Sequence, residues 1–264
     1  ERDREGFDLV AYWARSGLMD LVRAPGADPA PALPGMGDHP TAVSLYAAIL
    51  TALFKRQQTG EGSHVHTSLL ANGMWSASCI AQGVFAKADF TLYHHLSSHL
   101  FTRLLYEAAD GRWLQFSMVR TDEEVDMLFT AIGRPDLLLD PRFVTAELRV
   151  EHGNVLVEEM KAALISETSD HWMQVLTELG VPVALVGRVD ELTSDPQVIA
   201  NNMAITPTPE VGMPSVINHP LNVEGLATRP AGPAPDLGEH SEAILAELGY
   251  TPTDIARAKE QGVI

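Results

Sequence analysis

The sequence is poor in cysteine and in positive charge. Cys79 is its only cysteine among 264 residues, so no disulfide can form within the chain, which favours a reducing compartment. Lys and Arg number 18 against 35 Asp and Glu, which gives a formal net charge of −17 at pH 7. That charge has the wrong sign for a general binder of nucleic acids or anionic membranes. A bound anion would need a local site of backbone N–H groups, a helix start or a few basic side chains.

Several common sequence patterns are also missing. No apolar run is as long as a membrane span, and the first ten residues, ERDREGFDLV, lack the apolar stretch of a signal peptide. Neither GxGxxG, a P-loop, GxSxG nor HExxH occurs. The composition, with 45% hydrophobic and 20% charged residues, is that of a globular protein. We therefore expect a globular protein located in the cytoplasm.

Two long apolar stretches predict helices within the first 90 residues. Residues 41–56 are apolar nearly all round, with Pro40 at the first helical position and His39 as the expected cap. A second helix is expected from Leu69 to Lys87. Its residues Met74, Trp75 and Cys79 are predicted to lie in a core. Because this part of the sequence predicts too little sheet to cover both helices, we expect a further segment or a partner chain to pack against them.

The middle of the chain, residues 100–195, predicts a compact α+β unit. Two β-like runs flank Asp110-Gly111, a typical hairpin turn, and Thr121 with Glu124 forms a capping box. The other expected elements are helices over 121–133, 146–166 and 169–179, a buried strand within 180–188, short strands over 203–225, and two short terminal helices, the last starting at Thr251.

Asp38 is the main candidate for chemistry. It lies in the stretch GMGDHPTA, between Gly37 and His39, just before an apolar helix. An aspartate there commonly caps the helix. If His39 is the cap, however, the carboxylate of Asp38 is free, and the helix start keeps it ionised. Gly35 and Gly37 would let a ligand approach the backbone, and nearby N–H groups could hold an oxyanion. Such a carboxylate can attack a reactive acyl group.

Histidine pairs give no strong indication of a metal site. His64 and His66 share one face if their segment is a strand, and His95 and His99 are one helical turn apart. A zinc site needs a third or fourth ligand, and the sequence offers none nearby. Ordinary surface or core histidines explain the first pair, and contact with an acyl group is the better hypothesis for the second. We expect no metal.

An ordered set of motifs resembles the family III CoA-transferases, which include formyl-CoA and carnitine-CoA transferases and the 2-methylacyl-CoA racemases. The motifs are GFDLVAYWARSGLM, PGMGDHPTAVSLYAAILTALFKRQQTGEGSHVHTSLL, YEAADGRWLQF, GRPDLLLDPRF, ELGVPVALVGRVDELTSDPQV and PAPDLGEHSEAILAELGYTPTDIARAKEQGVI. They run through almost the whole chain. The resemblance begins after the family's first Rossmann-like half, where many CoA contacts lie.

The resemblance implies an α/β fold with a Rossmann-like large domain and a smaller α+β domain. Residues 1–97 and 198–264 would belong to the large domain and residues 98–197 to the small one. Asp38 matches the aspartate that attacks the acyl-CoA thioester and passes CoA to an acceptor acid. Coenzyme A would be a substrate, with no other cofactor. The partner would be a second copy in an interlocked homodimer, or a chain that supplies the first half.

Two departures separate the transferases from the racemases. Racemases carry histidine at the position of Phe7 and glutamate near Thr121, and proton transfer on both faces of a substrate needs two bases. We therefore expect a CoA-transferase with Asp38 as nucleophile and with Gly37, His39 and Phe7 contributing to substrate binding. A racemase or a CoA-linked dehydratase relative is the first alternative. A truncated, non-catalytic partner chain is the second. The glycine-rich loop of formyl-CoA transferase is not evident, so oxalate and formate are poor substrate candidates.

Overall fold

The computed structural model describes residues 5–24, 26–88, 101, 105–116, 119, 121–226 and 229–264. The chain divides into two compact units, Glu1–Val186 and Gly187–Ile264. The expected division at residues 97 and 197 stays a prediction. His94, His95 and His99 lie outside the described residues.

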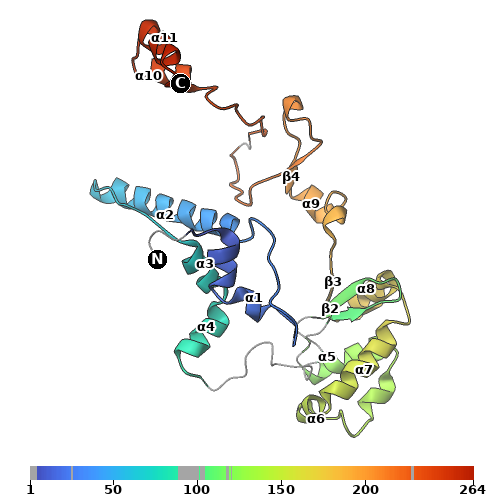
Figure 1. Ribbon diagram of the computed structural model, residues 1–264. Coiled ribbons are helices and arrows are strands. Elements are labelled where there is room, and N and C mark those ends of the chain that lie inside the picture. Colours follow the sequence, from blue (N-terminus) through green and yellow to red (C-terminus); the bar gives the residue numbers. More distant parts are fainter. Residues whose placement is uncertain are drawn as a thin grey trace. The chain divides into compact units, whose positions relative to one another are not determined.

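The first part of the chain is helical. A π-helical turn, η1 (Asp8–Ala14), is followed by α1 (Leu18–Leu21), the long helix α2 (Asp38–Thr59), α3 (Leu69–Ser76) and α4 (Ser78–Phe85) (Figure 1). Helix α2 starts two residues earlier than the sequence predicted, with Gly37 at the N-cap, so the expected cap role of His39 is wrong. The predicted helix from Leu69 to Lys87 is interrupted at Ala77.

The apolar surface of α2 is uncovered in this chain. No residue of α2 is buried, and large side chains such as Leu50 and Phe54 are 45% and 63% exposed. Figure 1 shows its first turns beside α3 and its far end extending away from it. The predicted core positions are likewise wrong for the chain alone: Trp75 is 80% exposed, Met74 is 39% exposed and Cys79 is exposed. Something outside the described residues must cover this surface if it is to be buried.

Residues 105–186 form the predicted α+β body. Strands β1 (Leu105–Glu107), β2 (Trp113–Phe116) and β3 (Val183–Leu185) make an antiparallel sheet in that order. The hairpin at Asp110-Gly111 is confirmed, with Gly111 at φ 74°. The strand expected within 180–188 forms, but it lies at the sheet edge and is only half-buried. The remaining elements are α5 (Asp122–Ala131), a 3₁₀ turn (Pro135–Leu138), α6 (Ala146–Glu151), α7 (Gly153–Leu164) and α8 (Ser169–Glu178).

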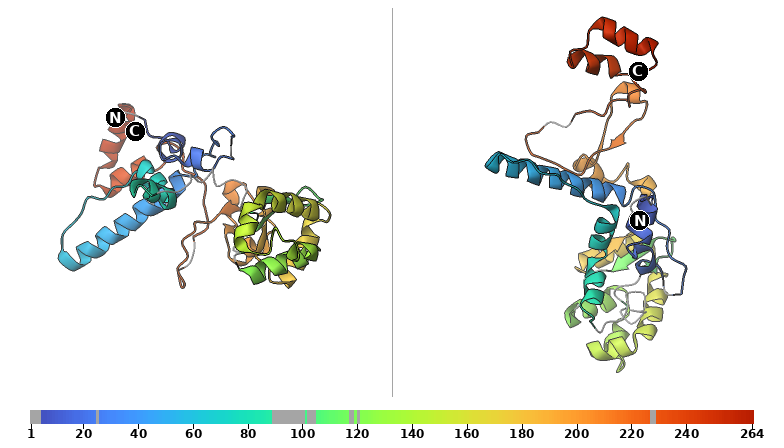
Figure 2. Two further views of the ribbon diagram at one scale, coloured as in Figure 1. Left: turned by 90° about the horizontal axis from the view of Figure 1, so that it is seen from below. Right: turned by 60° about the vertical axis from the view of Figure 1, so that its left-hand side comes forward.

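Helices α7 and α8 pack against this sheet, and Figure 2 shows all four helices gathered with it in one body. The core includes fully buried Tyr106, Leu114 and Leu176. The capping box of Thr121 and Glu124 is present at the start of α5. This part of the chain therefore has the packed interior that α2 lacks.

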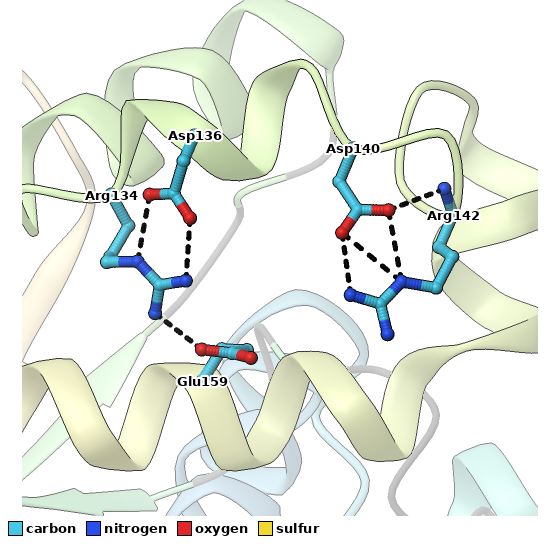
Figure 3. Close-up of polar contacts among 5 residues, drawn as sticks. All are labelled: Arg134, Asp136, Asp140, Arg142 and Glu159. Carbon is cyan, nitrogen blue, oxygen red and sulfur yellow. Dashed lines mark hydrogen bonds and ion pairs between the residues drawn. The ribbon is translucent and has the colours of Figure 1, made fainter.

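Ion pairs fix the segment that follows α5. Arg134 donates to Asp136 on its own loop and to Glu159 on α7, at 2.8 and 2.5 Å (Figure 3). Both acidic partners raise the pKa of Arg134. Arg142 binds Asp140 through its guanidinium and its backbone N–H, and this holds the pKa of Asp140 down to about 2. The charged residues of the motif GRPDLLLDPRF thus form ion pairs that stabilise the local structure.

The second unit contains short elements. These are a 3₁₀ turn (Val189–Glu191), α9 (Pro196–Ala200), β4 (Ala204–Ile205), a 3₁₀ turn (Pro209–Val211), β5 (Val216–Ile217), α10 (Ser241–Glu247) and α11 (Pro252–Glu260). The short strands predicted over 203–225 are confirmed as β4 and β5, and these two strands pair antiparallel. The last helix starts after Thr251, which forms a capping box with Asp254. Within the described part of the chain, no helix is both long and apolar enough to span a membrane.

Candidate active site

Asp38 is the first residue of α2 and its side chain is exposed. It follows a tight turn in which Gly35 has φ 84° and its carbonyl accepts the N–H of His39 at 3.0 Å. For the carboxylate of Asp38 the structure records no hydrogen bond or ion pair with any described residue. The positive end of the helix dipole lies at this position and favours a negative charge there. An ionised and accessible carboxylate is what a nucleophile requires.

Gly37 is packed against η1. It is buried, and its N–H donates to Oδ1 of Asp8 at 3.0 Å. A Cβ at this position would lie 2.4 Å from that oxygen and 2.4 Å from Cγ of Tyr12. Close packing within the chain therefore requires glycine here, whereas the sequence suggested room for a ligand. A contact between Gly37 and a substrate stays a prediction.

Two candidate oxyanion donors are already engaged. The N–H of Gly37 is bound to Asp8, and the N–H of His39 is bound to the carbonyl of Gly35. Pro40 has no N–H. The backbone N–H of Asp38 itself is the remaining candidate in the first turn of α2.

The π-helical turn η1 connects this region to α3. Tyr12 makes a 2.6 Å hydrogen bond with Ser76, and a Cβ on Gly73 would lie 2.3 Å from the carbonyl oxygen of Tyr12. Helix α2 is joined to α3 directly, since Ser44 donates to Asn72 at 2.5 Å. Both ends of the Asp38 turn are thus held by elements that pack on α3.

The other predicted site residues lie close in sequence but differ in placement. Phe7 is the N-cap of η1, and its side chain is 66% exposed, immediately before the buried Asp8. His39 is exposed, and a Cβ on Gly35 would lie 3.2 Å from its ring. Substrate binding by Phe7 and His39 stays a prediction.

Asp8 is the functional candidate that sequence reasoning missed. In the sequence it directly follows Phe7, in the motif GFDLVAYWARSGLM, and no role was predicted for it. The sequence does carry a signal, because Asp8 is a carboxylate within a run of apolar residues, and a buried carboxylate needs a hydrogen-bond donor. The identity of that donor, 29 residues away, is visible only in the fold.

Asp38 belongs to no candidate metal-binding cluster of the described residues, and it does not line the cavity of the second unit. Across the residues that the structure describes, no group of three or more His, Cys, Asp or Glu side chains could hold a metal ion. The rings of His64 and His66 are 5.8 Å apart. In the second unit a cavity of about 730 Å³ is lined by residues of α9, β4, β5 and the segments next to them, among them Ile199, Met203 and Asn218.

The sequence is similar to those of several proteins named as CoA-transferases. The chain is 29% identical to (R)-2-hydroxy-4-methylpentanoate CoA-transferase of Clostridioides difficile, over 100% of this chain and 66% of that protein. It is 26% identical to cinnamoyl-CoA:phenyllactate CoA-transferase of Clostridium sporogenes, over 97% of this chain and 63% of that protein. The chain thus spans less than two thirds of the length of these relatives.

The fold also matches a solved structure. A CaiB/BaiF family protein from Brucella suis superposes with a TM-score of 0.78 at 24% identity, covering 93% of this chain and 64% of that one. This likeness confirms the expected fold class. The model of the family described as CoA-transferase family III matches residues 1–241. The chain therefore belongs to CoA-transferase family III.

Proposed function

We propose that this chain carries the nucleophile of an enzyme that moves CoA from an acyl-CoA to a carboxylic acid. The observation that supports the proposal most directly is the exposed Asp38 carboxylate at the first position of α2, without a recorded partner among the described residues. Family membership supports the reaction class. Because the chain spans only part of its relatives, the activity of the whole protein belongs to the proposal.

The proposed reaction has four balanced steps. The carboxylate of Asp38 attacks the thioester carbonyl, and CoA leaves as a thiolate, which gives a mixed anhydride. The thiolate attacks the aspartyl carbonyl, forming an aspartyl-CoA thioester and releasing the donor acid. The acceptor carboxylate attacks that thioester and expels the thiolate again. Attack of the thiolate on the acceptor's acyl carbonyl then yields the new acyl-CoA and regenerates Asp38.

The substrates follow from the relatives only as a starting panel. The names of the two transferases compared above each include a 2-hydroxy acid, 2-hydroxy-4-methylpentanoate or phenyllactate. An acceptor panel therefore begins with 2-hydroxy acids of different side-chain size and includes simple alkanoic acids as a comparison. Coenzyme A is part of the substrate in this proposal. The proposed location of the enzyme is the cytoplasm.

Trapping with hydroxylamine tests the role of Asp38. The full chain is incubated with an acyl-CoA and hydroxylamine and then digested for mass spectrometry. We expect a hydroxamate at Asp38, because hydroxylamine attacks the activated aspartyl carbonyl. Asp38→Asn should lose transfer by at least about a thousandfold, since the nucleophile is gone. Asp28→Asn, which changes an exposed carboxylate in the preceding loop, should behave like the wild type.

Two other outcomes identify the alternatives. Exchange of the α-hydrogen of the acyl group with deuterated solvent, without CoA transfer, would support the racemase. The exposed Phe7 offers no proton, so the transferase remains the stronger proposal. Absence of both reactions, even with a chain supplying the rest of the relatives' length, would leave a non-catalytic partner chain.

We further propose that a second copy of this chain covers the apolar surface of α2. No residue of the helix is buried, and Leu50 and Phe54, which are 45% and 63% exposed, would each gain about 1–2 kcal/mol on full burial. Light scattering after size exclusion should give the mass of a dimer. If the chain is instead a monomer, and forms a defined complex only when a chain supplying the rest of the relatives' length is added, that added chain is what covers α2. The interlocked arrangement of the family is part of this proposal.

A further inference from the structure

The buried carboxylate of Asp8 is unusual because its surroundings satisfy only part of it. The side chain is 6% exposed, and Oδ1 accepts the N–H of Gly37. Oδ2 is also buried, and no described residue gives it a hydrogen bond. Burying a carboxylate with one donor opposes folding more than an apolar residue of the same shape would. A structural need for stability therefore gives a poor account of Asp8.

The contact of Asp8 falls next to the nucleophile. Gly37 is the N-cap of α2, and Asp38 follows it directly. On its other side Gly37 is held by the helix, because its carbonyl accepts the N–H of Thr41 at 3.2 Å. With both backbone groups of Gly37 bound, the peptide that leads into Asp38 has little freedom to rotate.

The element that carries Asp8 is itself fixed. Tyr12, one turn along η1, is 4% exposed and bonded to Ser76 of α3. The absence of a side chain at Gly73 lets α3 approach the backbone of Tyr12 closely. The turn before Asp38 is therefore held in place relative to α3 by η1, which bonds to Gly37 through Asp8 and to Ser76 through Tyr12.

We propose that Asp8 is a positioning residue for the acyl-transfer reaction: by holding the N–H of Gly37, it fixes where the Asp38 carboxylate stands. This inference rests on the proposed role of Asp38 as nucleophile. Asp8 acts through Gly37, and no contact between Asp8 and the substrate is required.

Three variants of the full chain test the inference. Asp8→Leu removes the acceptor with an apolar side chain of similar size. Asp8→Asn keeps an acceptor oxygen for the N–H of Gly37. Ser44→Ala is the control: it removes the hydrogen bonds from Ser44 to Asn72 of α3 and to the carbonyl of Pro40, and it leaves the bond between Gly37 and Asp8 in place. Thermal unfolding of each variant shows how much stability it loses.

The readout is the single-turnover rate of Asp38 acylation together with KM for the acyl-CoA. Asp8→Leu should slow acylation about 10- to 100-fold with KM unchanged, as expected for the loss of one buried hydrogen bond that fixes the nucleophile. Asp8→Asn should recover most of the rate. Ser44→Ala should acylate normally. Normal acylation by folded Asp8→Leu, or equal slowing by Ser44→Ala at equal loss of stability, would overturn the inference.

Hydrogen exchange separates this inference from the proposed function. In Asp8→Leu the amide of Gly37 should exchange faster, while amides in the middle of α2 keep their wild-type rates. Unchanged exchange at Gly37 would refute the positioning role whatever the chemistry. A wild-type chain that protects the Gly37 amide but never acylates Asp38, even with a chain supplying the rest of the relatives' length, would instead refute the proposed function, and with it the catalytic purpose of Asp8.

Discussion

Replacing Gly37 by alanine should destabilise the turn that carries Asp38. The new Cβ would lie 2.4 Å from Oδ1 of Asp8 and 2.4 Å from Cγ of Tyr12. Non-bonded carbons normally stay about 3.5–4.0 Å apart, so one or both side chains must move by roughly 1 Å. Overpacking of this kind costs about 1–3 kcal/mol. Displacing Asp8 also leaves the buried N–H of Gly37 unpaired, at about 1–3 kcal/mol more.

The two costs together predict a clear fall in the unfolding midpoint. At about 2–4 °C per kcal/mol for a chain of this size, a loss of about 2–6 kcal/mol lowers the midpoint by at least about 4 °C. Circular dichroism during heating measures it. Gly62→Ala is the control, because a Cβ at Gly62 meets nothing within 4 Å. If Gly37→Ala and Gly62→Ala unfold at the same temperature, the packing described between Gly37 and η1 is wrong.

Two further predictions concern residues 105–186. Trp172→Phe should lower the free energy of unfolding, measured in urea, by about 1–3 kcal/mol, because the buried indole N–H of Trp172 donates to the carbonyl of Leu164 at 2.7 Å. Trp75→Phe changes a side chain that is 80% exposed and should leave the free energy of unfolding almost unchanged. Equal losses would contradict this assignment of burial. For Asp140, the bound Arg142 lowers the pKa to about 2, so ionised Asp140 stabilises the fold above its unfolded pKa, and this is lost as pH falls through about 2. Asp140→Asn should therefore be less stable than wild type at pH 7 and equal to it below about pH 2; a gap that persists in acid would refute the ion pair as the cause.

Local signals predicted the middle of the chain well. The hairpin at Asp110-Gly111 and the capping box of Thr121 with Glu124 each depend on residues within a few positions of one another. Turn and cap geometry is determined by such short patterns. The start of α2 was two residues off because Pro40 suits the first helical position, yet the turn at Gly35 already bends the chain into the helix at Asp38.

Contacts between distant segments could not be read from the sequence. The bond from Gly37 to Asp8 joins residues 29 apart, and no periodicity relates them. The same limit explains Trp75, which has the hydrophobicity of a core residue but is 80% exposed in this chain. Hydrophobicity reports that a side chain favours burial, but not which surface buries it.

Few buried side chains pack near Asp38, so the hydrogen bond between Gly37 and Asp8 is a larger share of what holds this turn. Among the described residues, Tyr12, Leu18 and Ala77 form the buried cluster of the part of the chain that carries α2, and Trp13, Leu21 and Leu69 pack against it partly buried. Hydrophobic burial is non-directional, so a partner that covers α2 would hold the helix more firmly without determining where its first residue points. A hydrogen bond constrains both distance and angle, and the one from Gly37 to Asp8 acts one residue before the proposed nucleophile. The two proposals are thus separable: the proposed assembly depends on the apolar length of α2, and the proposed positioning of Asp38 depends on η1.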